Sequence, residues 1–148
     1  MVEQLLSCAT LLSVDLMSEK EYNNILDSLF IKMPDDDLIL DLEFVSSNMN
    51  KTISIIRLYC EEHNIDYTVF GRFLMEGLMK EYSRYNTDIK GFAAKVYELW
   101  KIIPPTIQSV EPFYTMCYAD DPLSWSDKEQ TRKLYEKMFR FYDEAGNF

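Results

Sequence analysis

The stretch from Asp66 to Tyr85, DYTVFGRFLMEGLMKEYSRY, decides the fold class because its apolar residues recur at the spacing of an α-helix. Those residues are predicted to face inward: Phe70, Phe73, Leu74, Leu78, Tyr82 and Tyr85. The opposite side carries charges at four-residue steps, which is typical of a solvated helix face: Arg72, Glu76, Lys80 and Arg84. Gly71 and Gly77 lie inside this helix, where glycine costs about 1 kcal/mol relative to alanine. We therefore expect another helix to approach closely there.

Four shorter stretches of the same periodicity precede this helix, at residues 2–14, 18–30, 35–49 and 52–63. In the second, Ser18 and Glu21 have the spacing of a capping box, and Phe30 is expected on the buried face. Asp35 follows Pro34 and is predicted to cap the third helix, whose apolar stripe would extend to Met49.

A further helix is predicted to begin at Thr87 or Asp88 and to end at Pro104-Pro105. The segment 106–120 has the least regular pattern. Ser126 and Glu129 form a second capping-box pair, which predicts a last helix that begins at Ser126.

These patterns predict an all-α protein, an irregular bundle of about seven or eight helices in one domain over residues 1–148. Four glycines and five prolines leave little material for hairpin turns, which disfavours an all-β fold. The sequence has no repeat of fixed period, so a solenoid is not expected.

The three cysteines are far apart and share no motif, which favours reduced thiols in a cytosolic protein over a disulfide framework. The N-terminal apolar run lacks a preceding lysine or arginine and contains Glu3, so it is a poor match to a signal peptide. No stretch reaches the length of a membrane span. We expect a cytoplasmic location and no association with a membrane.

The formal net charge of −10 disfavours nucleic acid and anionic membranes as partners. The charge is unevenly distributed. Residues 1–50 have ten acidic and two basic residues, whereas residues 51–110 have seven acidic and eight basic ones. The negative field therefore belongs mainly to the first third of the chain.

The densest acidic cluster is Pro34–Glu43, PDDDLILDLE. Negative charge at the start of a helix is favoured by the helix dipole, which accounts for Asp35, Asp36 and Asp37. The helix dipole accounts less well for Asp41 and Glu43, or for the scarcity of lysine and arginine around these two residues. With Asp27 in the preceding helix, these residues are predicted to form a docking surface for a basic protein.

A second candidate region is CYADDPLSW, Cys117 to Trp125. Asp121 and Pro122 have the pattern of an N-cap followed by proline at the first helical position. Trp125 is predicted to be a core or hinge aromatic, although an exposed tryptophan is also a good interface anchor. Asp120 has no structural role that the sequence indicates, so Asp120 and Trp125 are added to the candidate partner-binding residues.

The single histidine, His63, is a candidate for a catalytic or metal site, and it follows Cys60 by three residues. Neighbouring side chains at this spacing can share a metal, but a zinc site needs two more ligands and no motif supplies them. His63 also lies near a predicted helix end, where a cation or a capping donor is common. We predict no catalytic residue, no metal and no cofactor.

In size, charge, predicted fold and its mixture of acidic, tyrosine and tryptophan residues, the chain resembles the small, acidic, helical immunity proteins of bacterial toxin systems. The resemblance transfers no individual residues. It implies a non-enzymatic protein that neutralises a basic, nuclease-like toxin through an acidic face. Two alternatives stay open: a structural subunit of a larger assembly, and a metal-dependent enzyme that uses His63, Cys60, Asp120 and Asp121.

Overall fold

A computed structural model describes residues 1–85 and 87–144. The described part is all-α, as predicted, with nine α-helices and no strand. The helices are α1 (Val2–Ser13), α2 (Glu19–Lys32), α3 (Asp37–Phe44), α4 (Met49–Glu61), α5 (Tyr67–Arg84), α6 (Ile89–Ile102), α7 (Pro105–Gln108), α8 (Thr115–Tyr118) and α9 (Lys128–Phe139). Two short 3₁₀ helices, η1 (Asp121–Trp125) and η2 (Phe141–Asp143), flank α9.

Side-chain caps mark where most of the longer helices begin. The Ser18 hydroxyl accepts a hydrogen bond from the Glu21 amide, as the capping-box pattern predicted. Asp66 caps α5 and Asp88 caps α6, so both helices begin where the sequence indicated. Each of these side chains satisfies an amide that has no partner within the helix.

Three predicted boundaries are wrong. Asp36, not Asp35, caps α3, and this helix ends at Phe44, so Met49 belongs to α4. Asp127, not Ser126, caps α9 by accepting from the Gln130 amide. The start of α9 is displaced because the 3₁₀ helix η1, which was not predicted from the sequence, directly precedes it.

The 3₁₀ helix η1 changes the roles of two residues predicted as caps. Ser126 adopts a left-handed conformation (φ 62°) that ends η1, so it is not free to begin the next helix. Asp121 is the first residue of η1 rather than its cap; Asp120 is in the N-cap position, and the Asp120 side chain makes no capping hydrogen bond.

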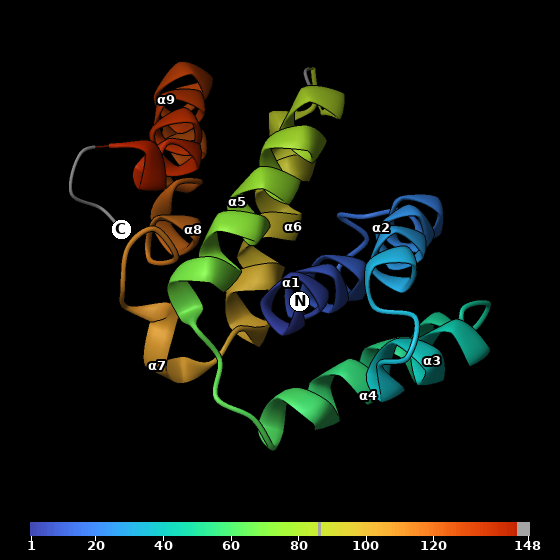
Figure 1. The fold of residues 1–148 in the computed structure, drawn as a ribbon. Helices are drawn as coiled ribbons and strands as arrows, with labels where there is room; N and C mark the ends of the chain where they lie inside the picture. The colour runs from blue at the N-terminus through green and yellow to red at the C-terminus, as the bar shows by residue number, and fades with distance from the viewer. Residues whose placement is uncertain (86, 145–148) are drawn as a thin grey trace.

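The buried side chains form two clusters. The N-terminal core is mostly aliphatic and consists of Leu5, Cys8, Ala9, Tyr22, Leu26, Leu29, Leu38, Ile39, Leu42 and Ile56. The C-terminal core is rich in aromatic residues and includes Phe70, Phe92, Phe113, Tyr135, Phe139 and Tyr142. Figure 1 shows α1 between the two groups of helices, with α2 to α4 on one side and α5 and α6 on the other. Leu11 and Leu16, from α1 and the turn after it, belong to the C-terminal core.

The two glycines of α5 are both sites of close approach. A Cβ atom at Gly77 would lie 2.5 Å from Cδ1 of Leu11, which confirms the predicted close approach of another helix, α1. At Gly71 the neighbour is instead the ring of Tyr142, from η2. Both positions therefore exclude a larger residue without a shift of the neighbouring side chain.

An ionic contact joins the two groups of helices outside the cores. Arg84 of α5 forms a salt bridge with Glu21 of α2 at 2.6 Å and a second one with Glu81 of its own helix. Glu81 is buried, and its desolvation raises the pKa of its carboxyl despite the opposing effect of Arg84. No helix within residues 1–85 and 87–144 is both long and apolar enough to cross a bilayer.

Candidate functional site

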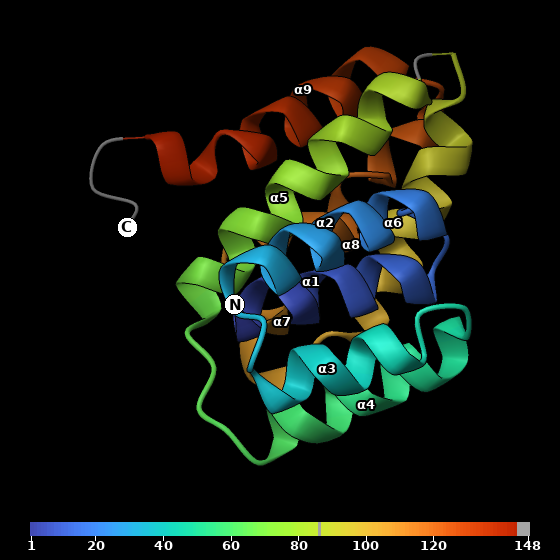
Figure 2. The same ribbon diagram turned by 45° about the vertical axis from the view of Figure 1, so that its right-hand side comes forward.

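The acidic residues predicted to bind a partner lie on α2, on α3 and on the turn between these two helices. We call this set the acidic face: Asp27, Asp35, Asp36, Asp37, Asp41 and Glu43. Asp36 and Glu43 are half-buried and the other four are exposed. Figure 2 shows α3 and α4 at the end of the molecule opposite α9, with α2 above them.

Among the residues of the acidic face, only Asp36 has a clear structural role. The Asp36 carboxylate accepts a hydrogen bond of 3.1 Å from the Ile39 amide and so caps α3. Asp37 lies in the first turn, where the helix dipole favours negative charge. Dipole and cap together account for these two residues but not for Asp27, Asp41 or Glu43.

Asp27 and Glu43 lie close together, although they belong to different helices. Desolvation raises the pKa of Glu43, and the Asp27 carboxylate raises it further through its charge and a hydrogen bond. Two carboxylates held together favour a proton or an incoming cation between them. This contact places one acidic residue of α2 beside one acidic residue of α3.

Among the described residues, no residue of the acidic face takes part in a salt bridge. Salt bridges are formed instead by Glu21, Glu81, Glu98 and Glu129. Uncompensated charge on adjoining helices repels itself and slightly destabilises the fold. A cationic surface bound at this position would relieve the repulsion.

The outer side of α3 alternates acidic and apolar residues. Asp37 and Asp41 are four residues apart, as are Leu40 and Phe44, and all four residues are exposed. The Phe44 side chain is 92% exposed and that of Leu40 is 44% exposed. The opposite side of α3 supplies Leu38, Ile39 and Leu42 to the N-terminal core.

The sequence analysis missed these exposed apolar residues. Phe44 falls outside the stripe of Leu38, Leu42 and Val45, and this offset was the signal that it faces away from the core. In α2, Phe30 was predicted on the buried face but is 37% exposed. It follows Leu29 by one position, which turns its side chain by about 100° from the buried stripe. Ile31, next in the chain, is 80% exposed.

Asp120 and Trp125 are not part of the acidic face. They lie around η1, next to α8 and α9, whereas α3 lies at the other side of the molecule (Figures 1 and 2). Trp125 is 60% exposed, so it is not a core aromatic, and the other part of that prediction, a hinge aromatic, stays a prediction. Asp120 is half-buried, and desolvation, with a smaller contribution from Asp121, raises the pKa of its carboxyl.

His63 has a structural role at the end of α4, as the sequence analysis favoured. Its ring stacks on Tyr59 with centroids 3.9 Å apart, and Nδ1 lies 2.7 Å from the Tyr59 carbonyl oxygen. Because a carbonyl only accepts, Nδ1–H is the donor, and it caps the helix C-terminus. In the part of the chain that the structure describes, no three or more His, Cys, Asp or Glu side chains form a group able to hold a metal.

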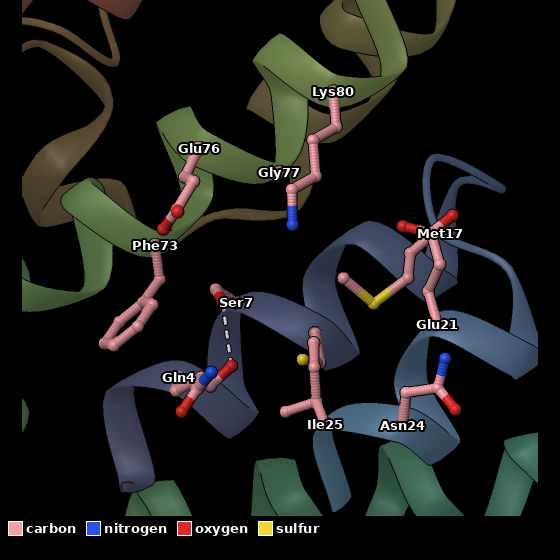
Figure 3. Close-up of a pocket in the computed structure, with 11 residues that line it drawn as sticks. Gln4, Ser7, Met17, Glu21, Asn24, Ile25, Phe73, Glu76, Gly77 and Lys80 are labelled. Carbon is pink, nitrogen blue, oxygen red and sulfur yellow. Dashed lines mark hydrogen bonds between the residues drawn. The ribbon is translucent and has the colours of Figure 1, made fainter. Parts of the chain in front are cut away.

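A pocket of about 270 Å³ lies where α1, α2 and α5 meet (Figure 3). Its lining mixes apolar side chains such as Met17, Ile25 and Phe73 with charged ones such as Glu76 and Lys80. Figure 3 shows the Lys80 side chain extending from α5 toward α1.

The pocket also contains Cys8, the most buried of the three cysteines, none of which is in a disulfide. Burial raises the pKa of the Cys8 thiol to about 12, so the thiol stays protonated at neutral pH. Cys8 is therefore not a thiolate nucleophile in this pocket. Glu21, another lining residue, is engaged by Arg84.

Comparisons with protein-family models, with curated proteins and with solved structures found no match for this chain.

Proposed function

We propose that this chain is a non-enzymatic binding module for a basic protein, and that the partner is a nuclease-like toxin domain, which the chain neutralises by binding to it. One observation carries the proposal. Six carboxylates gather on α2, α3 and their connecting turn, and none has a salt-bridge partner among the described residues. The proposal assigns no catalytic residue and no cofactor.

Complementary charge is the physical basis of the proposed recognition. A basic protein surface is attracted to the acidic face over roughly the Debye length, about 8 Å at physiological ionic strength. Such attraction raises the association rate and selects against acidic partners. The close pair of Asp27 and the partly desolvated Glu43 marks the point where a bound cation would relieve most repulsion.

The nuclease-like character of the partner follows from the same complementarity. A nuclease must bind a polyanion, so the surface around its active site is basic. An acidic protein that covers this surface competes with nucleic acid for the same lysine and arginine residues. This is the mode of action implied by the resemblance to immunity proteins.

The test begins with the partner itself, identified from the adjoining gene and by affinity capture from the native cell. We then expect Asp27→Asn/Asp37→Asn/Asp41→Asn/Glu43→Gln, which spares the cap Asp36, to slow association about tenfold or more at low salt. The rate should also lose most of its salt dependence. Stopped-flow measurements at two ionic strengths give both quantities.

A matched control removes four exposed acidic residues elsewhere: Glu61→Gln/Glu62→Gln/Asp121→Asn/Glu144→Gln. Both variants have the same net charge, so a loss confined to the first one identifies the acidic face rather than total charge. Equal rates for the wild type and both variants, unaffected by salt, would contradict the proposal.

The exposed apolar residues Phe44 and Ile31 favour a second candidate, a structural subunit of a larger assembly. A permanent interface of that kind buries a large apolar area and is insensitive to salt. Sedimentation at low and high salt separates the two candidates, because only an electrostatically steered complex weakens as salt rises.

A further inference from the structure

We propose that the outer side of α3 is the docking element for a basic amphipathic segment of the partner. In this arrangement apolar side chains of the segment cover Phe44 and Leu40, while its lysine or arginine residues meet Asp37 and Asp41. The inference deepens the proposed function and depends on it, because it specifies what the basic partner must present.

The first argument is the exposure of Phe44. A phenylalanine that is 92% exposed contributes almost nothing to its own fold, yet a buried aromatic ring is a strong source of binding energy. Phe44 is in the last turn of α3, one helical turn from Leu40, so both side chains can meet the same partner surface.

The second argument is the order of residues along α3. Acidic and apolar side chains alternate on this side, so an apolar contact would be bordered by carboxylates: Asp37, Leu40, Asp41 and Phe44. An apolar centre with a polar rim is the usual anatomy of a protein interface. A segment with apolar side chains flanked by lysine or arginine matches this order, and a purely basic segment does not.

Charge also decides between possible occupants. A second copy of this chain would bring another acidic face against the first, and an anionic membrane or a nucleic acid would bring phosphates. Each of these would repel Asp37 and Asp41. A basic segment is attracted by them, so the partner is a protein whose docking segment is basic as well as apolar.

The experiment uses two synthetic peptides of equal length and charge. One has leucine and lysine at the spacing of an amphipathic helix, and the other has alanine in place of each leucine, which preserves helix propensity. We expect the leucine peptide to bind the full chain at least about tenfold more tightly, because its apolar side chains cover Phe44 and Leu40. Amide chemical shifts should change mainly in α3.

The decisive variant is Leu40→Ser/Phe44→Ser, which should reduce the affinity ratio of the two peptides to about one. Both side chains are exposed, so the melting temperature should stay the same. The matched control is Leu58→Ser/Val110→Ser, which changes two other residues that are each at least half exposed and lie on α4 and after α7. The control should preserve the preference for the leucine peptide.

Two results would overturn the inference in distinguishable ways. If both peptides bind equally, with affinities that depend on salt and on Asp37 and Asp41, the proposed apolar contact with Phe44 and Leu40 is wrong. The proposed electrostatic role of the acidic face is then retained. If neither peptide responds to salt or to those carboxylates, the proposed function fails together with the inference.

Discussion

The two cores of the molecule differ in what they do with aromatic residues. The C-terminal core buries them: the Phe92 ring lies edge-on to Tyr82 and Tyr135, with centroids 5.4 and 5.0 Å away. The N-terminal core is mostly aliphatic, and the helices around it leave Phe30, Ile31, Leu40 and Phe44 at the surface beside the acidic face. We interpret the aromatic core as the source of stability and the outer side of α2 and α3 as the binding surface.

The strongest test of this contrast compares one phenylalanine from each region. Phe92→Ala should lower the free energy of unfolding by about 3–5 kcal/mol, because it opens a cavity among buried rings. Phe44→Ala should change it by about 0.5 kcal/mol or less. Urea unfolding followed by circular dichroism measures both values, and similar losses would show that the two regions do not differ in this way.

A smaller effect is expected where α1 packs against α5 in the C-terminal core. Gly77→Ala places a methyl group against Leu11, and such overpacking costs about 1–3 kcal/mol. Alanine also stabilises a helix by about 1 kcal/mol relative to glycine, so the net loss in the free energy of unfolding should be at most about 2 kcal/mol. Ser83→Ala, on the exposed side of α5, is the control and should be neutral or slightly stabilising. A gain in stability from Gly77→Ala would mean that α1 and α5 are not tightly packed.

The smallest effect concerns pH and the link between α2 and α5. The folded state raises the pKa of Glu81 above its usual value of 4.5, mainly by desolvation, so the folded state binds this proton more tightly than the unfolded state. Stability from this group is therefore greatest below pH 4.5 and falls as pH rises through the raised pKa. In the Glu81→Gln variant, the free energy of unfolding should therefore fall less than in the wild type as pH rises.

Urea unfolding at pH 4, 6 and 7.5 measures the difference between wild type and Glu81→Gln. Glu98→Gln is the control, because Glu98 is exposed and pairs with Lys101 at the same spacing as Glu81 with Arg84. A difference between Glu81→Gln and wild type that does not change with pH would contradict the assigned role of desolvation.

Helix content could be predicted because it depends on local periodicity. The spacing of Phe70, Leu74 and Leu78 is sufficient to identify α5 and its buried side. Boundaries at Ser18, Asp66 and Asp88 were also predictable, since in each case a capping side chain directly precedes the helix. Close approach at Gly77 followed from the energetic cost of glycine within a helix.

Other features depend on geometry that local pattern does not contain. The cap of α9 moved from Ser126 to Asp127 because the chain leaves η1 in a left-handed turn, which involves Pro122 and Leu123 through backbone hydrogen bonds. Whether an aromatic residue such as Trp125 is buried depends on which helices cover it. The acidic face was identified from composition, whereas its contact between Asp27 and Glu43 required the packing of α2 on α3.

The position of α1 between the two cores also has a consequence for synthesis. Leu5 and Ala9 can be covered as soon as α2 to α4 have emerged, but Leu11 needs α5 and α6, which are translated much later. At ribosomal rates of about 5–20 residues per second, one side of α1 stays uncovered for roughly 4–18 seconds. During that interval the nascent chain exposes an apolar helix side, which is the kind of surface that chaperones bind.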